Sequence, residues 1–288
     1  MWAKCGQKRF EARLKPSETL ESRHSCEWWF FSKFKELLRP ASLTFTLKEA
    51  GHTYDDGHVG LAPTMLTISE QRVAVIGLNG AGKSTLLGLL DGSLKANIGT
   101  VTVSGGSEQL NPAVKKDLKR IDDLVGKVRR EEIPNSFYRA ANVSEAVSEA
   151  LKKHKVPESE RHARIGNLFA HFNLAQVSKA KASELDSEKR HLLAIAAALS
   201  FEPSAIVADE PSKGLDEIGT AHVAKALFSY NKQVIFATHD TDMIRRPEYA
   251  IDRVLVLDEH AVVCDDAPAE AVAFYEDLIR RKYEASKR

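Results

Sequence analysis

The sequence predicts an α/β fold built on a mostly parallel central sheet. Two short apolar runs, Ala205-Ile206-Val207-Ala208 and Val234-Ile235-Phe236-Ala237, indicate buried strands, and a segment of helical periodicity separates them. A third apolar run, at 72–76, leads through a glycine-rich turn into an apolar helix. Strands that alternate with helices favour a parallel sheet covered on both faces. With 288 residues, 43% of them hydrophobic, the chain can form one such domain plus an inserted lobe.

The other elements follow from hydrophobic periodicity in chain order. Leu43, Phe45 and Leu47 alternate with threonines, which is typical of a half-buried strand. The expected elements are a strand at 43–47, a polar turn at 50–58, strands at 65–68, 72–76 and 101–103, a largely helical, charged stretch at 115–184, an apolar helix at 192–199, strands at 205–208, 234–237, 253–257 and 261–263, and a last helix from about 268.

The first 41 residues differ in composition from the rest. They hold all 3 tryptophans, including the run Trp28-Trp29-Phe30-Phe31, among basic side chains. Three interpretations stay open: an amphipathic segment that touches lipid or a partner, a helix packed on its own domain, or an upstream extension from a mis-chosen start codon. We therefore expect an N-terminal extension at 1–41, a main domain at 42–280 with a helical subdomain at about 108–200, and a basic tail at 281–288.

Composition limits the classes of partner that this chain is expected to bind. A net charge of +1 gives no general argument for nucleic-acid binding, and we expect none. Cys5, Cys26 and Cys264 lack metal-ligand spacing, so reduced thiols in a cytosolic setting are expected. The sequence contains no apolar run near the roughly 20 residues that a membrane span needs. A role at a membrane would therefore require docking onto another subunit.

The turn after the 72–76 strand matches the phosphate-binding pattern G-x-x-x-x-G-K-[ST], from Gly77 to Ser84. Its glycines let backbone N–H groups face phosphate oxygens, while the lysine reaches the β and γ phosphates and the serine hydroxyl can bind Mg²⁺. The helix that follows directs its positive end at the same anion. The predicted nucleotide-binding residues here are Asn79, Gly80, Ala81, Gly82, Lys83, Ser84 and Thr85.

Polar side chains follow two of the predicted buried strands. Asp209 and Glu210 end one strand, and His239 follows the next one along the chain. Ligands of open α/β sheets bind at this carboxyl edge. Asp209 suits Mg²⁺ together with Ser84, Glu210 suits a general base for an attacking water, and a neutral His239 can contact a γ-phosphate.

With these residues the chain resembles the ATP-binding subunits of ABC transporters from about Leu43 to Leu278. Gly77–Ser84 corresponds to Walker A, 205–209 to Walker B, Pro211–Asp216 to the dimer-contacting D-loop, and 238–240 to the switch-histidine loop. Tyr54 occupies the position of the family's adenine-stacking aromatic residue. The resemblance implies a P-loop NTPase fold with an antiparallel β subdomain and an inserted helical subdomain, and it implies ATP, Mg²⁺ and ATP hydrolysis.

Among the subfamilies, the sequence around the phosphate loop is similar to that of energy-coupling-factor ATPases, in particular those of biotin importers. This implies a peripheral protein at the cytoplasmic face of the membrane. Its implied partners are a transmembrane coupling subunit and a second ATPase.

Two departures from the family pattern stand out. Leu185-Asp186-Ser187-Glu188-Lys189 occupies the place of the signature L-S-G-G-Q, and it would bring two carboxylates towards a phosphate held by the opposite subunit. Arg129-Arg130 follows 125–128 where the family has the Q-loop glutamine. Arg130 either neutralises phosphate charge or pairs with Glu131 or Glu132.

In the family each ATP is held by Walker A of one subunit and the signature of the other. A homodimer of this chain would therefore contain two altered sites, whereas a heterodimer with an intact partner would keep one reasonable site. Two functions remain open: an importer ATPase, favoured by Glu210 and His239, and a nucleotide-binding subunit with little turnover, favoured by the two departures.

Overall fold

The computed structural model describes residues 42–129 and 133–287. The tryptophan-rich extension and Arg130, with its possible partners Glu131 and Glu132, lie outside the described residues. The strands of the main unit are β1 (Thr44–Thr53), β2 (Val59–Ile68), β3 (Arg72–Gly77), β4 (Ile98–Gly105), β5 (Glu108–Leu110), β6 (Val125–Val128), β7 (Ala205–Asp209), β8 (Gln233–Ala237), β9 (Arg253–Asp258) and β10 (Ala261–Asp266). The helices are α2 (Lys83–Leu90), α3 (Lys115–Leu124), α4 (Val143–Lys153), α5 (Glu158–His171), α6 (Ser187–Leu199), α7 (Glu217–Phe228), α8 (Thr241–Arg245) and α9 (Pro268–Ala285).

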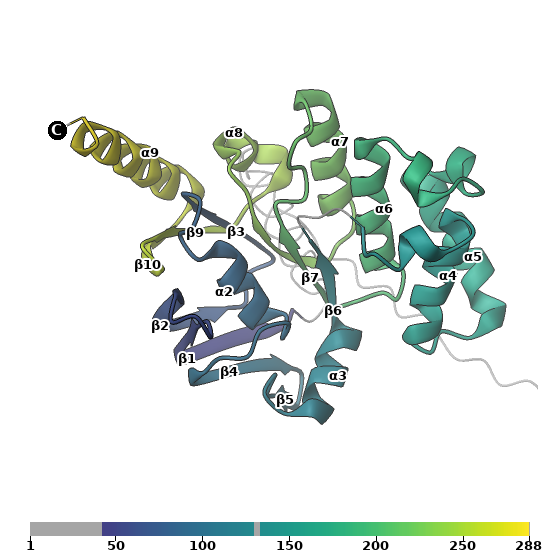
Figure 1. The fold of residues 1–288 in the computed structure, drawn as a ribbon, viewed down its shortest axis with the longest axis horizontal. Coiled ribbons are helices and arrows are strands. Elements are labelled where there is room, and N and C mark those ends of the chain that lie inside the picture. The colour runs from purple at the N-terminus through teal and green to yellow at the C-terminus, as the bar shows by residue number, and fades with distance from the viewer. Residues whose placement is uncertain (1–41, 130–132, 288) are drawn as a thin grey trace, which may run out of the picture. The chain divides into compact units, whose positions relative to one another are not determined.

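The central sheet has six strands in the order β10-β9-β3-β8-β7-β6, and only β10 runs antiparallel to its neighbour (Figure 1). The predicted α/β fold with a mostly parallel sheet is confirmed. The phosphate-loop strand β3 lies in the middle, between β8 and β9. Since these strands are parallel, the loops after β3, β7 and β8 emerge at the same edge of the sheet.

Side-chain alternation divides the interior into two cores. On one face of the sheet Val73, Val75 and Val207 pack with helix α2 and the antiparallel strands. On the other face Ala74 and Ile206 pack with the helices from α4 to α7. Because successive side chains of a strand point to opposite faces, strands buried on both sides have continuous apolar sequences.

A second sheet, antiparallel and in the order β2-β1-β4-β5, carries Tyr54 just after β1. The expected polar turn at 50–58 is shorter in the structure, because β1 continues to Thr53. The pairing of β1 with β2 shifts register between Leu47 and Thr53, and Glu49 has a φ of 50°, as expected where a strand bulges. The bulge let the strand pass through residues whose composition suggested a turn.

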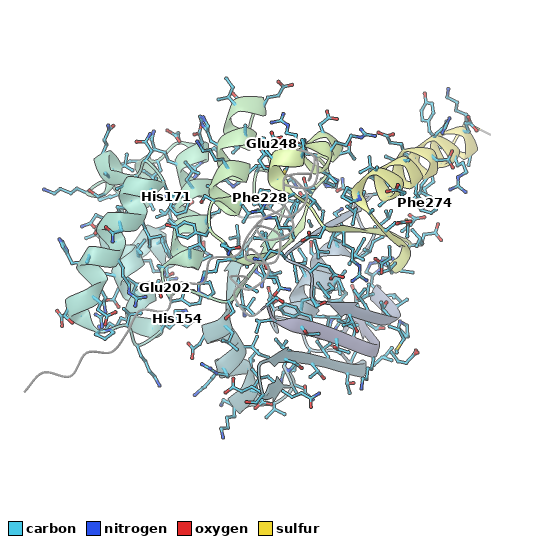
Figure 2. All side chains as sticks on the ribbon, turned by 180° about the vertical axis from the view of Figure 1, so that it is seen from behind. His154, His171, Glu202, Phe228, Glu248 and Phe274 are labelled. Carbon is cyan, nitrogen blue, oxygen red and sulfur yellow. The ribbon has the colours of Figure 1, made fainter. Side chains whose placement is uncertain are left out.

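Helices α4, α5 and α6 lie beyond strand β6 (Figure 1). The ring of His154, at the end of α4, stacks on Phe201, just beyond α6, with 3.7 Å between ring centroids (His154 is labelled in Figure 2). Helix α9 continues past residue 280 to Ala285, and the Lys282 ammonium lies 2.7 Å from a carboxylate oxygen of Asp258. Within 42–129 and 133–287, the helices are too short or too polar to cross a membrane.

Candidate functional site

The phosphate loop joins β3 to α2, and its backbone geometry requires glycine. Gly82 has a φ of 101°, and a Cβ there would lie 2.6 Å from the carbonyl oxygen of Gly60. Gly80 has a φ of 81°, which side chains rarely tolerate. The buried Lys83 ammonium donates to the carbonyls of Gly77 (2.8 Å) and Leu78 (3.1 Å). The loop thus holds the Lys83 ammonium on its concave side, where an anion can bind.

The loop lines a cleft of about 370 Å³. All seven predicted nucleotide-binding residues from Asn79 to Thr85 lie on it. Tyr54 also lines the cleft, and its hydroxyl lies 3.0 Å from the Thr85 hydroxyl. Tyr54 is 38% exposed, and its ring is roughly parallel to the ring of His58, with centroids 6.4 Å apart. An exposed aromatic face beside a phosphate loop can stack on a nucleotide base.

Asp209, at the end of β7, has a carboxylate suited to a cation. Its Oδ1 is buried and accepts no hydrogen bond from the part of the chain that the structure describes. A buried acceptor without a donor is costly, and a bound cation would remove that cost. Within that part no three His, Cys, Asp or Glu side chains gather as a metal site. A single carboxylate and a serine hydroxyl fit Mg²⁺, which is usually held by one or two protein oxygens together with phosphates and waters. Asp209 and Ser84 would hold it.

Glu210 follows Asp209 with a φ of 48°, an unusual value for a residue with a side chain. Its N–H donates to the carbonyl of Ala237 on β8 at 3.0 Å. Its carboxylate is 2% exposed, with Oε1 2.6 Å from His239 Nε2 and Oε2 3.5 Å from the Lys213 ammonium. The structure therefore brings the predicted base and the predicted switch histidine into direct contact.

The residues at the signature position are engaged within their own chain. Asp186 caps helix α6: its Oδ1 accepts the Lys189 N–H at 2.8 Å, and its Oδ2 lies 2.5 Å from the Lys189 ammonium. These hydrogen bonds from the Lys189 ammonium and N–H hold the pKa of the Asp186 carboxyl below its usual value. Glu188 pairs with His222 on α7 at 2.8 Å. Both carboxylates thus have partners within the chain, and these partners reduce the repulsion that the carboxylates would exert on a phosphate of the opposite subunit.

At the Q-loop position, Arg129 pairs with Asp91 rather than with the phosphate cleft. The Arg129 guanidinium lies 2.6 Å from Oδ2 of Asp91, whose side chain is fully buried at the end of α2. Asp91 Oδ1 accepts the Ser93 N–H at 2.8 Å. Removal of the arginine would leave a buried carboxylate without its cation, which is strongly unfavourable.

His58, Gly60, Lys213 and His260 also line the phosphate cleft, and of these only Lys213 belongs to a motif named above, the D-loop. Lys213 reaches it from the loop after β7, and His260 from the turn between β9 and β10. His260 has a φ of 67°, and its ring meets His58 edge to face with centroids 5.0 Å apart. Its carbonyl accepts the N–H of Ala62 on β2 at 2.8 Å. Nothing in the sequence indicates that this turn meets β2, so periodicity could not place His260 in the cleft.

Comparisons with known proteins agree with this architecture. Residues 63–213 match the ABC transporter family. A Deinococcus radiodurans protein that carries the name of an ABC transporter ATP-binding protein is 33% identical over 80% of this chain and 96% of its own length. The biotin transport ATP-binding protein BioM of Rhizobium etli is 29% identical over 76% of this chain and 92% of its own length. The energy-coupling factor transporter ATP-binding protein EcfA2 of Clostridium perfringens is also 29% identical, over 82% of this chain and 81% of its own length.

The solved structure of cbiO1 from Clostridium perfringens, part of the ABC transporter complex cbiONQ, superposes with a TM-score of 0.68. Its sequence is 27% identical, and the match covers 84% of this chain and 94% of that one. The expected P-loop NTPase fold is therefore confirmed. On the family match, these relatives and the geometry of the phosphate loop, the chain belongs to the ABC transporter family, as an ATP-binding subunit.

Proposed function

We propose that this chain hydrolyses ATP to drive an importer of the energy-coupling-factor class, with biotin as the first substrate to test. The observation that carries the proposal is the contact of Glu210 with His239 at the sheet edge where the phosphate loop with Lys83 also emerges, after the neighbouring strand β3. The relatives named for biotin transport and for energy-coupling-factor transporters support the importer class.

The chemistry requires a water, a base and charge stabilisation. The water oxygen bonds to the γ-phosphorus as the bond to the β–γ bridging oxygen breaks, and ADP leaves with that electron pair. Glu210 accepts the proton of the water, because its carboxylate is oriented at the sheet edge by His239. Lys83 and the loop N–H groups bind the β and γ oxygens. Mg²⁺, bound through Ser84 and Asp209, would offset the charge of the phosphates.

The partners are a transmembrane coupling subunit and a second ATPase, at the cytoplasmic face of the membrane. We favour a heterodimer, because the N-terminus of α6 is capped by its own Asp186 rather than left open for a partner's phosphate. The intact site would then combine this chain's phosphate loop with the signature of the partner.

The capping of α6 by Asp186 also supports a second candidate function. A chain with an internally capped α6 and no glutamine at the Q-loop position could bind nucleotide and regulate a complex with little turnover. Phosphate release separates the two functions. The ATPase gives ATP-dependent release that Glu210→Gln lowers about a hundredfold or more, whereas the regulatory subunit binds ATP but gives equal, low release with and without this change.

Uptake in the host tests the importer. Deletion of the chain should lower uptake of labelled biotin, and re-expression of the wild type, but not of Lys83→Ala, should restore it. Unchanged biotin uptake together with reduced uptake of another vitamin or of a metal ion would correct the substrate alone. Unchanged uptake of all of them would refute the importer function.

A further inference from the structure

Lys213 lies on the loop between β7 and α7, beside the predicted base. Its N–H donates to the carbonyl of Glu210 at 3.1 Å, which closes a tight turn, and Gly214 follows with a φ of 82°. The Lys213 ammonium is 3.5 Å from Oε2 of Glu210. The turn therefore keeps a flexible cationic side chain close to a carboxylate that is almost fully buried.

The same side chain also lines the phosphate cleft. Lys213 is shared by this cleft and by a neighbouring cleft of about 510 Å³ that contains Glu210 and His239. Its side chain is 51% exposed, so it is free to turn between the two. The phosphate cleft already holds Lys83. A triphosphate in the cleft would thus meet one cation from the phosphate loop and a second from the loop after β7.

A triphosphate competes with Glu210 for this ammonium. Glu210 offers one negative charge, and its other oxygen is already in contact with His239. A terminal phosphate offers more charge and three acceptor oxygens, and hydrogen bonds between ions are the stronger ones. The exchange would remove the cation that lies 3.5 Å from Oε2 of Glu210.

We propose that Lys213 is a γ-phosphate-binding residue of this chain's own site, and that it restrains Glu210 when no nucleotide is bound. The proposal rests on the nucleotide-binding function given above. It predicts that Lys213 distinguishes ATP from ADP, because ADP lacks the phosphate that lies nearest to Glu210.

Calorimetric titration of the full chain with Mg-ATP and with Mg-ADP tests this. We expect Lys213→Ala to weaken ATP binding about tenfold and to change ADP binding less than twofold. Lys213→Arg should keep most of the ATP preference. Lys225→Ala is the matched control, because Lys225 is an exposed lysine on α7 that lines neither cleft.

The possible outcomes separate this inference from the proposed function. If the wild type binds neither nucleotide, the nucleotide-binding function itself is wrong. If it binds both and Lys213→Ala leaves the ratio of ATP to ADP affinity unchanged, the role of Lys213 is refuted while the function stands. Equal losses for both nucleotides would also refute it, since they indicate a general charge effect. The melting temperature of each variant confirms that it is folded.

Discussion

The imidazole Nε2 of His239 lies 2.6 Å from the carboxylate Oε1 of Glu210 and joins the ends of two neighbouring parallel strands. Glu210 is nearly buried, whereas the His239 side chain is 42% exposed and faces the cleft. The histidine can therefore orient the carboxylate from the cleft side. A base that is oriented before the nucleotide arrives needs little rearrangement during the reaction.

Replacement of Glu210 by glutamine should separate binding from hydrolysis. The amide keeps the shape of the side chain but cannot accept the proton of water, so we expect turnover to fall about a hundredfold or more with unchanged ATP affinity. Phosphate release and nucleotide titration measure the two effects. If the turnover number is unchanged, Glu210 is not the base or the activity belongs to a partner's site.

Lys83 should matter more for ATP binding than Tyr54 does. Lys83→Ala removes the ammonium inside the phosphate loop, whereas Tyr54→Ala removes a stacking surface worth roughly 1 kcal/mol. Tyr54→Phe is the control, because it keeps the ring and removes only the contact with Thr85. A fluorescent ATP analogue gives the affinities, and equal affinity in the wild type and Lys83→Ala would argue against this cleft as the site.

Much of this site could be predicted because it follows from strand ends. The buried strands before Gly77 and Asp209 are apolar runs of the right length, and their carboxyl ends meet wherever such strands are parallel. The partners of Asp186 and Glu188 could not be predicted in this way. The cap formed by Asp186 depends on where α6 begins, and the pair of Glu188 with His222 depends on how α6 packs against α7.

His260 gives a test of a residue that the sequence alone did not assign. His260→Gly should raise the free energy of unfolding by up to about 1 kcal/mol, because glycine accepts the positive φ without strain. It should also weaken nucleotide binding a few-fold, because it removes a ring from the cleft. Glu259→Gly is the control: Glu259 has a φ of 45° but does not line the cleft, so it should gain stability alone. Unchanged affinity in His260→Gly would mean that the ring does not contact nucleotide.

Asp186 should stabilise the fold in a pH-dependent way. Loss of the helix cap in Asp186→Ala should lower the free energy of unfolding by about 1 kcal/mol at pH 7. Since the folded pKa of this carboxyl lies below its usual value, its contribution is complete above the unfolded pKa and is lost as pH falls through the folded pKa. Urea titrations at several pH values should show a constant difference down to about pH 5 and a smaller one below about pH 4. Asp186→Asn should keep most of the stability, because asparagine also caps helices. A difference that grows on acidification would contradict this role.

Restoration of the family signature should improve self-pairing. The changes Asp186→Ser, Ser187→Gly, Glu188→Gly and Lys189→Gln remove the internal cap and provide glycine N–H groups that can approach a partner's phosphate. We expect stronger ATP-dependent dimerisation, measured by light scattering in the Glu210→Gln background, and faster hydrolysis, measured in the wild-type background. The loss of the Asp186 cap lowers stability, so both assays are run well below the melting temperature. If the native sequence already dimerises tightly with ATP and hydrolyses it as fast, the internally paired loop binds phosphate in another way and the heterodimer proposal is wrong.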